Sequence, residues 1–337
     1  MIFQSKPPLH PHSSLSVSKF YDDNDFYFDS GRSGLFTVIE CIKEKHANVV
    51  FFIPAYTCPS VLDVLIQQKV DFDFVDICDD FDFDLLDLDI LTEQHKNKKI
   101  ALIATSLFGI KLRDYKKIFK DFIIIEDLAQ SEPNSKSSSD FQFVSFGKGK
   151  LVSSWNGGLV RTNDAEFANL FLKLPTQDDF YRSYILSNIQ KIISKYLWFF
   201  IENSFMNPEK NIDWVKSEIV AKKISKMKKN WILTSLNNIN TNQRINVSNR
   251  YLSTIKKEYL FNLSSNIPYL RLPIKKKLNF NGISSLPDYK YVYDCAKIKR
   301  NRDFEIPMLL VNECSFLPTH DLIDEKYVLS VIGQINE

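Results

Sequence analysis

The sequence predicts an α/β fold, and three observations carry this prediction. Between residues 33 and 170, segments with the apolar spacing of helices alternate with segments of strand length. Most of the strand segments are continuously apolar, which is typical of a largely parallel sheet covered by helices on both faces. After about residue 165 the strand signals become few and long helical stretches follow. The chain therefore combines an α/β core with a more helical remainder.

The elements follow from these periods in chain order. Helical spacing of apolar residues covers 33–46, 59–69 and 115–120. Apolar or alternating runs predict strands at 48–54, 70–77, 98–106, 122–127, 141–146 and 157–162. Helical stretches are expected at 164–173, 181–206 and 215–260, and short mixed segments from about 265 precede a helix at 324–335. We predict a large domain over 1–240, with its core at 30–165 and a helical region at 165–240, and a small α+β domain over 241–337.

Composition excludes several classes of function. The 337 residues carry 43 Lys+Arg and 41 Asp+Glu, a formal charge of +2 that gives no reason to expect nucleic acid as a partner. Five scattered cysteines without C-x-x-C spacing predict neither a disulfide framework nor a metal site. The acidic run 71–89 lacks the ligand order of a calcium loop. Charges interrupt the most apolar run, 184–205, so we expect no integral membrane segment and a cytoplasmic protein.

Glycine is rare, and its positions are informative. Seven of the nine glycines fall in four short clusters, at 30–34, 107–109, 146–150 and 156–158. A sequence so sparing with glycine is expected to place it where backbone geometry requires it. Ligands of open α/β sheets bind at the carboxyl ends of strands. Four segments at such positions are candidates for function: the glycine clusters at 30–34, 146–150 and 156–158, and the segment 125–130, which contains the acids at the end of the strand 122–127.

Two candidates concern a negatively charged ligand and a catalytic acid. The segment Ser30–Leu35 opens a helix, where free backbone N–H groups favour an anion; the alternative is an ordinary serine cap. Asp127 ends a buried strand, with Gln130 three residues later, so it can orient a ligand or cap a turn.

Two further candidates lie around the later glycines. In the loop that holds Lys148 and Lys150, a lysine near a buried site can form a Schiff base with an aldehyde; the alternative is an exposed basic turn. The turn Asn156-Gly157-Gly158 is either a plain turn or a place where the backbone approaches a ligand closely.

The order of these motifs resembles the DegT/DnrJ/EryC1/StrS family of pyridoxal-phosphate (PLP) aminotransferases acting on nucleotide-linked sugars. The matching segments are SGRSGL (30–35), IPAYTCPSV (53–61) with VDFDFVDI (70–77), SLFG (106–109), IIEDLAQS (124–131), SFGKGK (145–150) and NGGLV (156–160). A weaker echo recurs at 280–288 and 317–320. The resemblance implies a type I PLP-dependent transferase fold with a mostly parallel, seven-stranded sheet, and PLP alternating with its aminated form, PMP.

The resemblance also implies the roles of the residues that touch the ring. Lys150 stands where the family has its Schiff-base lysine, so Lys148 is a neighbour. Asp127 matches the acid that pairs with the pyridinium nitrogen, and Gln130 matches the residue near the ring hydroxyl. A buried carboxylate beside a ring nitrogen favours its protonated form, which the cofactor needs as an electron sink.

The remaining implied roles concern the phosphate and the face of the ring. Arg32 and Ser33 occupy the phosphate-cradle positions, and Ser145 matches a serine that adds a hydroxyl. Cys58 stands where the family usually has an aromatic residue on the ring, so either Tyr56 or this thiol covers it.

Other departures mark a divergent member. Ser106 replaces a frequent histidine, Asn156 replaces a glutamate, and the family's GYN-x-R-M segment is not found. The resemblance implies a homodimer and an amino transfer from glutamate to a nucleotide-diphosphate-linked keto-sugar, for surface polysaccharide or related glycan biosynthesis. Three alternatives remain. They are another acceptor on the same cofactor, a non-catalytic relative with a binding role, and a dinucleotide-binding module, which lacks the G-x-G-x-x-G spacing.

Overall fold

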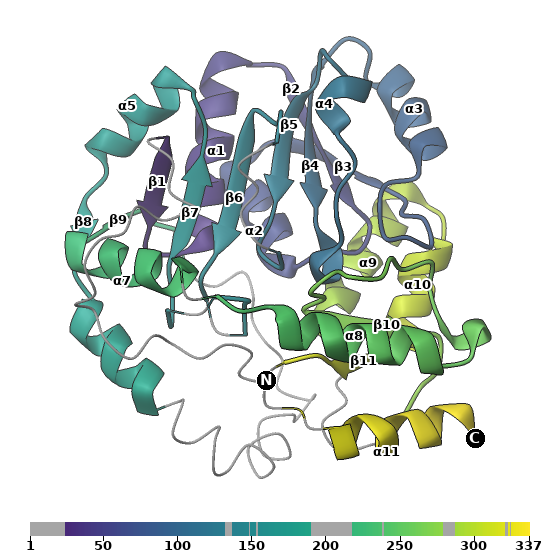
Figure 1. Cartoon of the computed structure of the whole chain (residues 1–337). Coiled ribbons are helices and arrows are strands. Elements are labelled where there is room, and N and C mark those ends of the chain that lie inside the picture. The colour runs from purple at the N-terminus through teal and green to yellow at the C-terminus, as the bar shows by residue number, and fades with distance from the viewer. Residues whose placement is uncertain are drawn as a thin grey trace.

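The structure of the chain, a computed structural model, describes residues 24–131, 137–147, 149–152, 154–189, 218–237, 239–278, 287–320, 323 and 325–337. Within these residues the centre of the molecule is a nine-stranded sheet of order β3-β2-β4-β5-β6-β7-β1-β9-β8 (Figure 1). The predicted α/β class is confirmed.

Six strands of this sheet, β2 to β7, match the strand runs predicted from the sequence. In sheet order the strands are β3 (Asp71–Val75), β2 (Val49–Pro54), β4 (Lys99–Thr105), β5 (Ile123–Asp127), β6 (Phe141–Ser145), β7 (Gly158–Arg161), β1 (Asp25–Phe28), β9 (Lys223–Ile224) and β8 (Thr176–Gln177). The first five run parallel, and β7 is antiparallel to both β6 and β1. All residues of β2 are buried, which is the reason for its unbroken apolar run.

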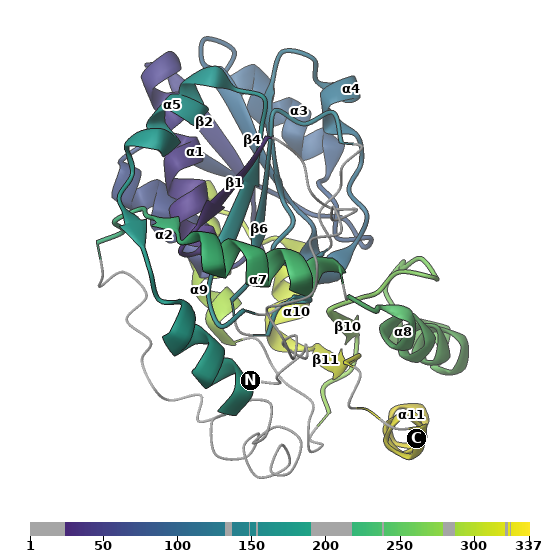
Figure 2. The same cartoon turned by 60° about the vertical axis from the view of Figure 1, so that its left-hand side comes forward.

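Helices cover both faces of the sheet (Figure 2). One face packs against α1 (Gly31–Lys45), α2 (Pro59–Gln68), α5 (Ala165–Lys173) and α9 (Pro287–Arg300). The other face packs against α3 (Leu85–Gln94), α4 (Tyr115–Ile118) and α7 (Lys226–Asn237). Alternate residues of one strand point to opposite faces: Phe51 of β2 packs with the first group of helices and Phe52 with the second. A further helix covers 180–189.

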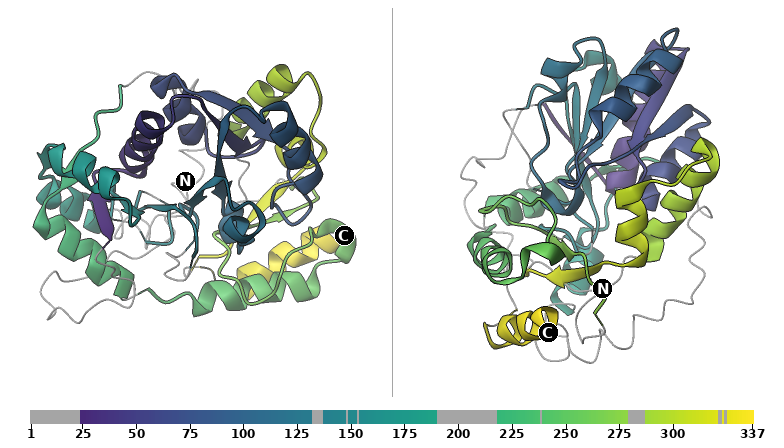
Figure 3. Two further views of the ribbon diagram at one scale, coloured as in Figure 1. Left: turned by 90° about the horizontal axis from the view of Figure 1, so that it is seen from above. Right: turned by 90° about the vertical axis from the view of Figure 1, so that its right-hand side faces the viewer.

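The C-terminal elements form a second cluster of buried side chains beside the sheet (Figure 3). They are α8 (Asn242–Thr254), the antiparallel pair β10 (Arg271–Ile274) and β11 (Ser315–Pro318), α10 (Glu305–Asn312) and α11 (Glu325–Asn336). Short 3-10 helices lie at Leu107–Gly109 and Lys257–Tyr259. Helix α9 belongs by its packing to the sheet, since Val292 and Ala296 lie in the core of α1 and α2. The division of the chain near residue 240 stays a prediction.

Several elements differ from those predicted. Strand β1 and helix α3 were not predicted, and the stretch 215–260 contains α7 and α8 separated by a break instead of one long helix. Among the described residues the sheet has nine strands instead of the seven that the resemblance implies: the six predicted from the sequence, β1, and two strands of two residues each, β8 and β9. The predictions for 1–23, Lys148, 190–217 and 279–286 lie outside the described residues. Of the helices that are described, none has both the length and the apolar character needed to cross a membrane.

Candidate active site

The predicted site residues lie along one edge of the sheet, where the parallel strands end. β2, β4, β5 and β6 end at this edge, β7 begins there, and β1 leads there directly into α1. Figure 1 shows α7 and α8 below this edge. The residues that lie in or just after these elements are Arg32, Ser33, Cys58, Asp127, Gln130, Ser145 and Lys150.

Asp127 is the last residue of β5, and its side chain is buried. The backbone N–H of Ala129 donates to its Oδ1 at 2.9 Å, and the hydroxyl of Thr105, its neighbour on β4, also donates to it. Burial raises the pKa of Asp127 to about 6, while the Ala129 N–H, the Lys150 charge and Thr105 act in the opposite direction. A carboxyl group held in this way can pair with a cationic ring nitrogen.

Lys150 lies in the loop that joins β6 to β7. The base of the loop is closed by the Phe146 N–H, which donates to the Gly157 carbonyl at 2.9 Å. Gly149 has a φ of +75°, a left-handed conformation that favours glycine, directly before Lys150. Lys150 is half-buried, and its charge acts on the buried Asp127. The two residues predicted to carry the chemistry therefore lie close enough for the charge of one to act on the other.

The start of α1 supplies two hydroxyl groups. Ser30 is the N-cap, and its Oγ accepts from the Ser33 N–H at 3.1 Å and lies 2.9 Å from the Ser33 Oγ. A Cβ added to Gly31 would lie 3.0 Å from the Cβ of Ser145 and 3.2 Å from its Oγ, so β6 brings a third hydroxyl beside them. The serine therefore caps the helix, which was one of the two alternatives from the sequence, and binding of an anion at this helix N-terminus stays a prediction. Arg32 is exposed.

The glycine pair before β7 makes a close approach to the chain's own backbone. Gly157 forms a bridge with Ser30, and a Cβ added to Gly158 would lie 2.4 Å from the Ser30 carbonyl oxygen. No side chain fits there without a shift of the backbone. The backbone of this turn therefore packs directly against the backbone at the start of α1.

Gln130 connects three segments around the site. Its Oε1 accepts from the Phe108 N–H at 3.1 Å, and its Nε2 donates to the Tyr289 hydroxyl at 3.3 Å. The Tyr289 ring lies 5.0 Å from that of Tyr56, and burial raises the pKa of both phenols, so both remain protonated. The Tyr56 hydroxyl is buried and has no hydrogen-bond partner among the described residues. Cys58 is half-buried at the start of α2.

Sequence reasoning missed Tyr289, and no local signal could have identified it. Its segment was expected to be short and mixed, whereas it forms the first turn of α9. Only the packing of α9 against the sheet brings this residue beside Gln130. His320, the last residue of the segment 317–320, is fully buried. Burial and the charges of Arg244 and Arg271 lower its pKa to about 3, so it is neutral at physiological pH.

The acidic run 71–89 has a structural explanation. Arg300 contacts Asp87 at 3.0 Å, and Arg113 contacts Asp80 at 3.0 Å and Asp82 at 3.5 Å. Arginine is suited to such pairs because its planar fork matches a carboxylate. In the part of the chain that the structure describes, no group of three or more His, Cys, Asp or Glu side chains could hold a metal ion.

Solved structures with a similar fold include two aminotransferases and a dehydratase of a GDP-linked sugar. One is a DegT DnrJ EryC1 StrS aminotransferase from Brucella abortus, with a TM-score of 0.67 and 18% identity over 92% of this chain and 84% of that one. A second is PseC from Helicobacter pylori, an aminotransferase involved in the biosynthesis of pseudoaminic acid (0.66, 15%, 92% and 85%). A third is the E. coli GDP-4-keto-6-deoxy-D-mannose-3-dehydratase with bound hydrated PLP (0.65, 13%, 93% and 87%). No family model and no curated protein matches the sequence.

Proposed function

We propose that the chain is a PLP-dependent aminotransferase that moves an amino group from glutamate to a nucleotide-diphosphate-linked keto-sugar. The observation that carries this proposal is the meeting of three groups at one edge of the sheet: the buried Asp127, the lysine Lys150 whose charge acts on it, and the hydroxyl of Ser145 beside the first turn of α1. PLP carries an aldehyde, a ring nitrogen and a phosphate. The site offers each of them a partner of the right chemistry.

The residues at the site fit this cofactor. The capped first turn of α1, with Ser30, Ser33 and Ser145, suits a phosphate, because helix N-termini favour anions. The carboxylate of Asp127 would hold a proton on the ring nitrogen. The amine of Lys150 would bind the aldehyde carbon and then move a proton between substrate and cofactor. When bound, PLP supplies an electron sink.

The cofactor assignment is tested by covalent trapping. Purified protein is mixed with PLP, reduced with borohydride, digested, and analysed by mass spectrometry. We expect the pyridoxyl group on Lys150, and none at this position in Lys150→Ala. Trapping at another lysine, or equal trapping in the variant, would remove the assignment. Lys226→Met, an exposed lysine on α7, serves as the control.

The acceptor class rests on the neighbours and on the resemblance. Two of the three neighbours described above are aminotransferases, one of them active in pseudoaminic acid biosynthesis, and the third is a GDP-sugar dehydratase. Relatives in the resembled family that perform dehydration have histidine in place of the Schiff-base lysine. Lys150 at this position therefore favours amino transfer. A panel of keto-sugar nucleotides with glutamate, read by 2-oxoglutarate release, separates a sugar acceptor from another acceptor.

The wider setting is part of the same proposal. We propose a cytoplasmic homodimer with a boundary between two domains near residue 240, acting in surface polysaccharide or related glycan biosynthesis. The missing GYN-x-R-M segment and the departure at Cys58 are what favour the alternative, a relative that keeps the fold only for binding. Glutamate-dependent release of 2-oxoglutarate by protein loaded with PLP would exclude that alternative.

A further inference from the structure

Lys228, on the first turn of α7, is a buried lysine that the proposed chemistry does not use. Its side chain is fully buried, yet its Nζ reaches both carboxylate oxygens of Asp179 at 2.7 and 2.9 Å and the Ser183 Oγ at 3.1 Å. It also donates to the Oδ1 of Asn156. A buried ammonium is tolerated only when it is fully paired in this way, so the four side chains hold one another in place.

Asn156 is fixed at both ends of its amide. Its Nδ2 donates to Asp179 at 2.9 Å, and its Oδ1 accepts from the Ser183 hydroxyl at 3.2 Å and from Lys228. Asn156 is the residue before Gly157 and Gly158, which press on the start of α1. The cluster around Lys228 therefore ends at the turn that supports the hydroxyl-lined start of α1.

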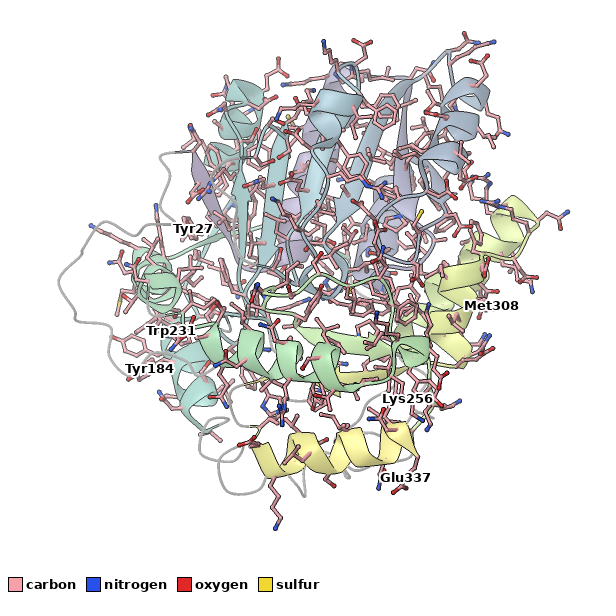
Figure 4. The ribbon with its side chains drawn as sticks, turned by 45° about the vertical axis from the view of Figure 1, so that its right-hand side comes forward. Tyr27, Tyr184, Trp231, Lys256, Met308 and Glu337 are labelled. Carbon is pink, nitrogen blue, oxygen red and sulfur yellow. The ribbon has the colours of Figure 1, made fainter. Side chains whose placement is uncertain are left out.

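Packed aromatic rings hold this cluster from the outside. Trp231 lies one turn after Lys228. The centroid of its ring is 6.0 Å from that of Phe180 and 5.9 Å from that of Tyr184, and both of these residues lie on the 180–189 helix. Figure 4 shows Tyr184 beside Trp231. Both helices are thus anchored together, and Lys228 projects from one of them to the 156–158 turn.

The charge of Lys228 also acts at the start of α1. Asp29, directly before the N-cap, is partly buried, and its Oδ1 has no hydrogen-bond partner among the described residues. Burial raises its pKa, whereas the Ser33 hydroxyl and the charges of Lys222 and Lys228 lower it. A carboxylate at this place would repel an anion bound at the helix N-terminus, and the nearby ammonium groups offset that repulsion.

We propose that Lys228 is a positioning residue for the phosphate group of the cofactor. Through its hydrogen bond to Asn156 it fixes the 156–158 turn against the first turn of α1. Its positive charge also offsets the negative charge of Asp29. This inference rests on the proposed function, because the anion is the phosphate of PLP. The phosphate depends on Lys228 more than the ring does, because Asp127 lies on another segment, β5, and Lys150, although it shares the β6–β7 loop with Asn156, lies six residues before it.

The test compares PLP with pyridoxal, which lacks the phosphate. Both are titrated by fluorescence into the full chain and into the double variant Lys228→Met with Asp179→Asn, which removes both charges of the pair. We expect PLP to bind the double variant at least about tenfold more weakly, while pyridoxal binding stays within about twofold. Lys226→Met, on the same turn but exposed, should change neither.

The outcomes separate this inference from the proposed function. An unmodified chain that binds neither compound would remove the proposed function. Unchanged PLP binding by the double variant, or equal losses for PLP and pyridoxal, would overturn the role of Lys228 alone. A second variant, Asn156→Asp with Asp179→Asn, exchanges the acid and the amide around Lys228. It should bind PLP with an affinity within about threefold of that of the unmodified chain. A larger loss would also count against the proposal.

Discussion

The same residue types serve opposite purposes at the strand tips and at the outer edge of the sheet. At the tips, the buried Asp127 has no arginine partner among the described contacts, and the charge that acts on it is that of Lys150. At the outer edge, Asp87 is buried but paired with Arg300 at 3.0 Å and Arg302 at 2.8 Å. The difference lies in how completely each carboxylate is paired.

This difference separates a site from a structural network. A buried carboxylate that is paired with guanidinium groups is held ionised in one position. Removal of one partner leaves a buried charge unpaired and should therefore lower the free energy of unfolding. A carboxyl group buried without such a partner is less stable in its charged form, and a cationic ligand can supply the missing charge. Each prediction below tests whether the two regions respond differently to the same kind of change.

The largest effect is expected from Asp127→Asn. The amide keeps the shape of the acid but cannot hold a proton on the ring nitrogen, so amino transfer should fall on the order of 10²–10³-fold. The measurement is single-turnover release of 2-oxoglutarate from glutamate by PLP-loaded protein. Glu126→Gln is the matched control, since this neighbour on β5 is buried and bonded to Ser137 and Gln142. A loss of less than tenfold in Asp127→Asn would contradict the assigned role.

The second prediction concerns the pH dependence of stability without PLP. The folded pKa of Asp127 is about 6, above its ordinary value of 3.8, so the folded state keeps a proton that the unfolded state loses. Stability from this group is therefore complete below about pH 4 and is lost as the pH rises through 6. Asp127→Asn should be more stable than the unmodified chain at pH 7, by at most about 3 kcal/mol. Urea unfolding at pH 4 and 7 measures the difference; equal stabilities at pH 7 would argue against it.

The third prediction moves to the outer edge. Arg300→Met removes one of the two arginine partners of Asp87 and a 2.8 Å hydrogen bond to the Phe74 carbonyl. Because Arg302 still reaches Asp87, we expect a loss of about 2 kcal/mol instead of the full cost of a broken buried pair. Activity per folded molecule should stay within twofold. Lys297→Met, which breaks an exposed pair, is the control and should leave the urea midpoint unchanged.

Sequence reasoning succeeded where the signal is local. Fully buried strands such as β2 and β4 read as apolar runs, and rare glycines marked the start of α1 and the β6–β7 loop. These two features placed Asp127 at the end of a strand and Lys150 in a loop that follows another strand. The resemblance then assigned them roles that the geometry is consistent with.

The rest depended on tertiary contacts without a local signature. Helix α3 was not predicted because its three acids obscure its apolar face, although Asp84 caps it and Asp87 is paired with an arginine of another element. Tyr289 and Lys228 reach the site only through the packing of α9 and α7. A lysine in a basic run is usually exposed, and nothing within that run shows that Asp179 neutralises it.

The smallest expected effect compares the caps of two helices, one in each region. Ser30 caps α1 at the strand tips, and Asp84 caps α3 at the outer edge, where its carboxylate accepts from the Leu86 N–H at 2.8 Å. Replacement of either by alanine should cost about 1 kcal/mol of unfolding free energy, since each leaves a first-turn N–H without its acceptor. Only Ser30→Ala should also weaken PLP binding, by about threefold to tenfold, because only that cap faces the proposed phosphate. Urea unfolding and PLP titration of both variants give the comparison, and weaker PLP binding in Asp84→Ala would show that cap loss alone disturbs the site.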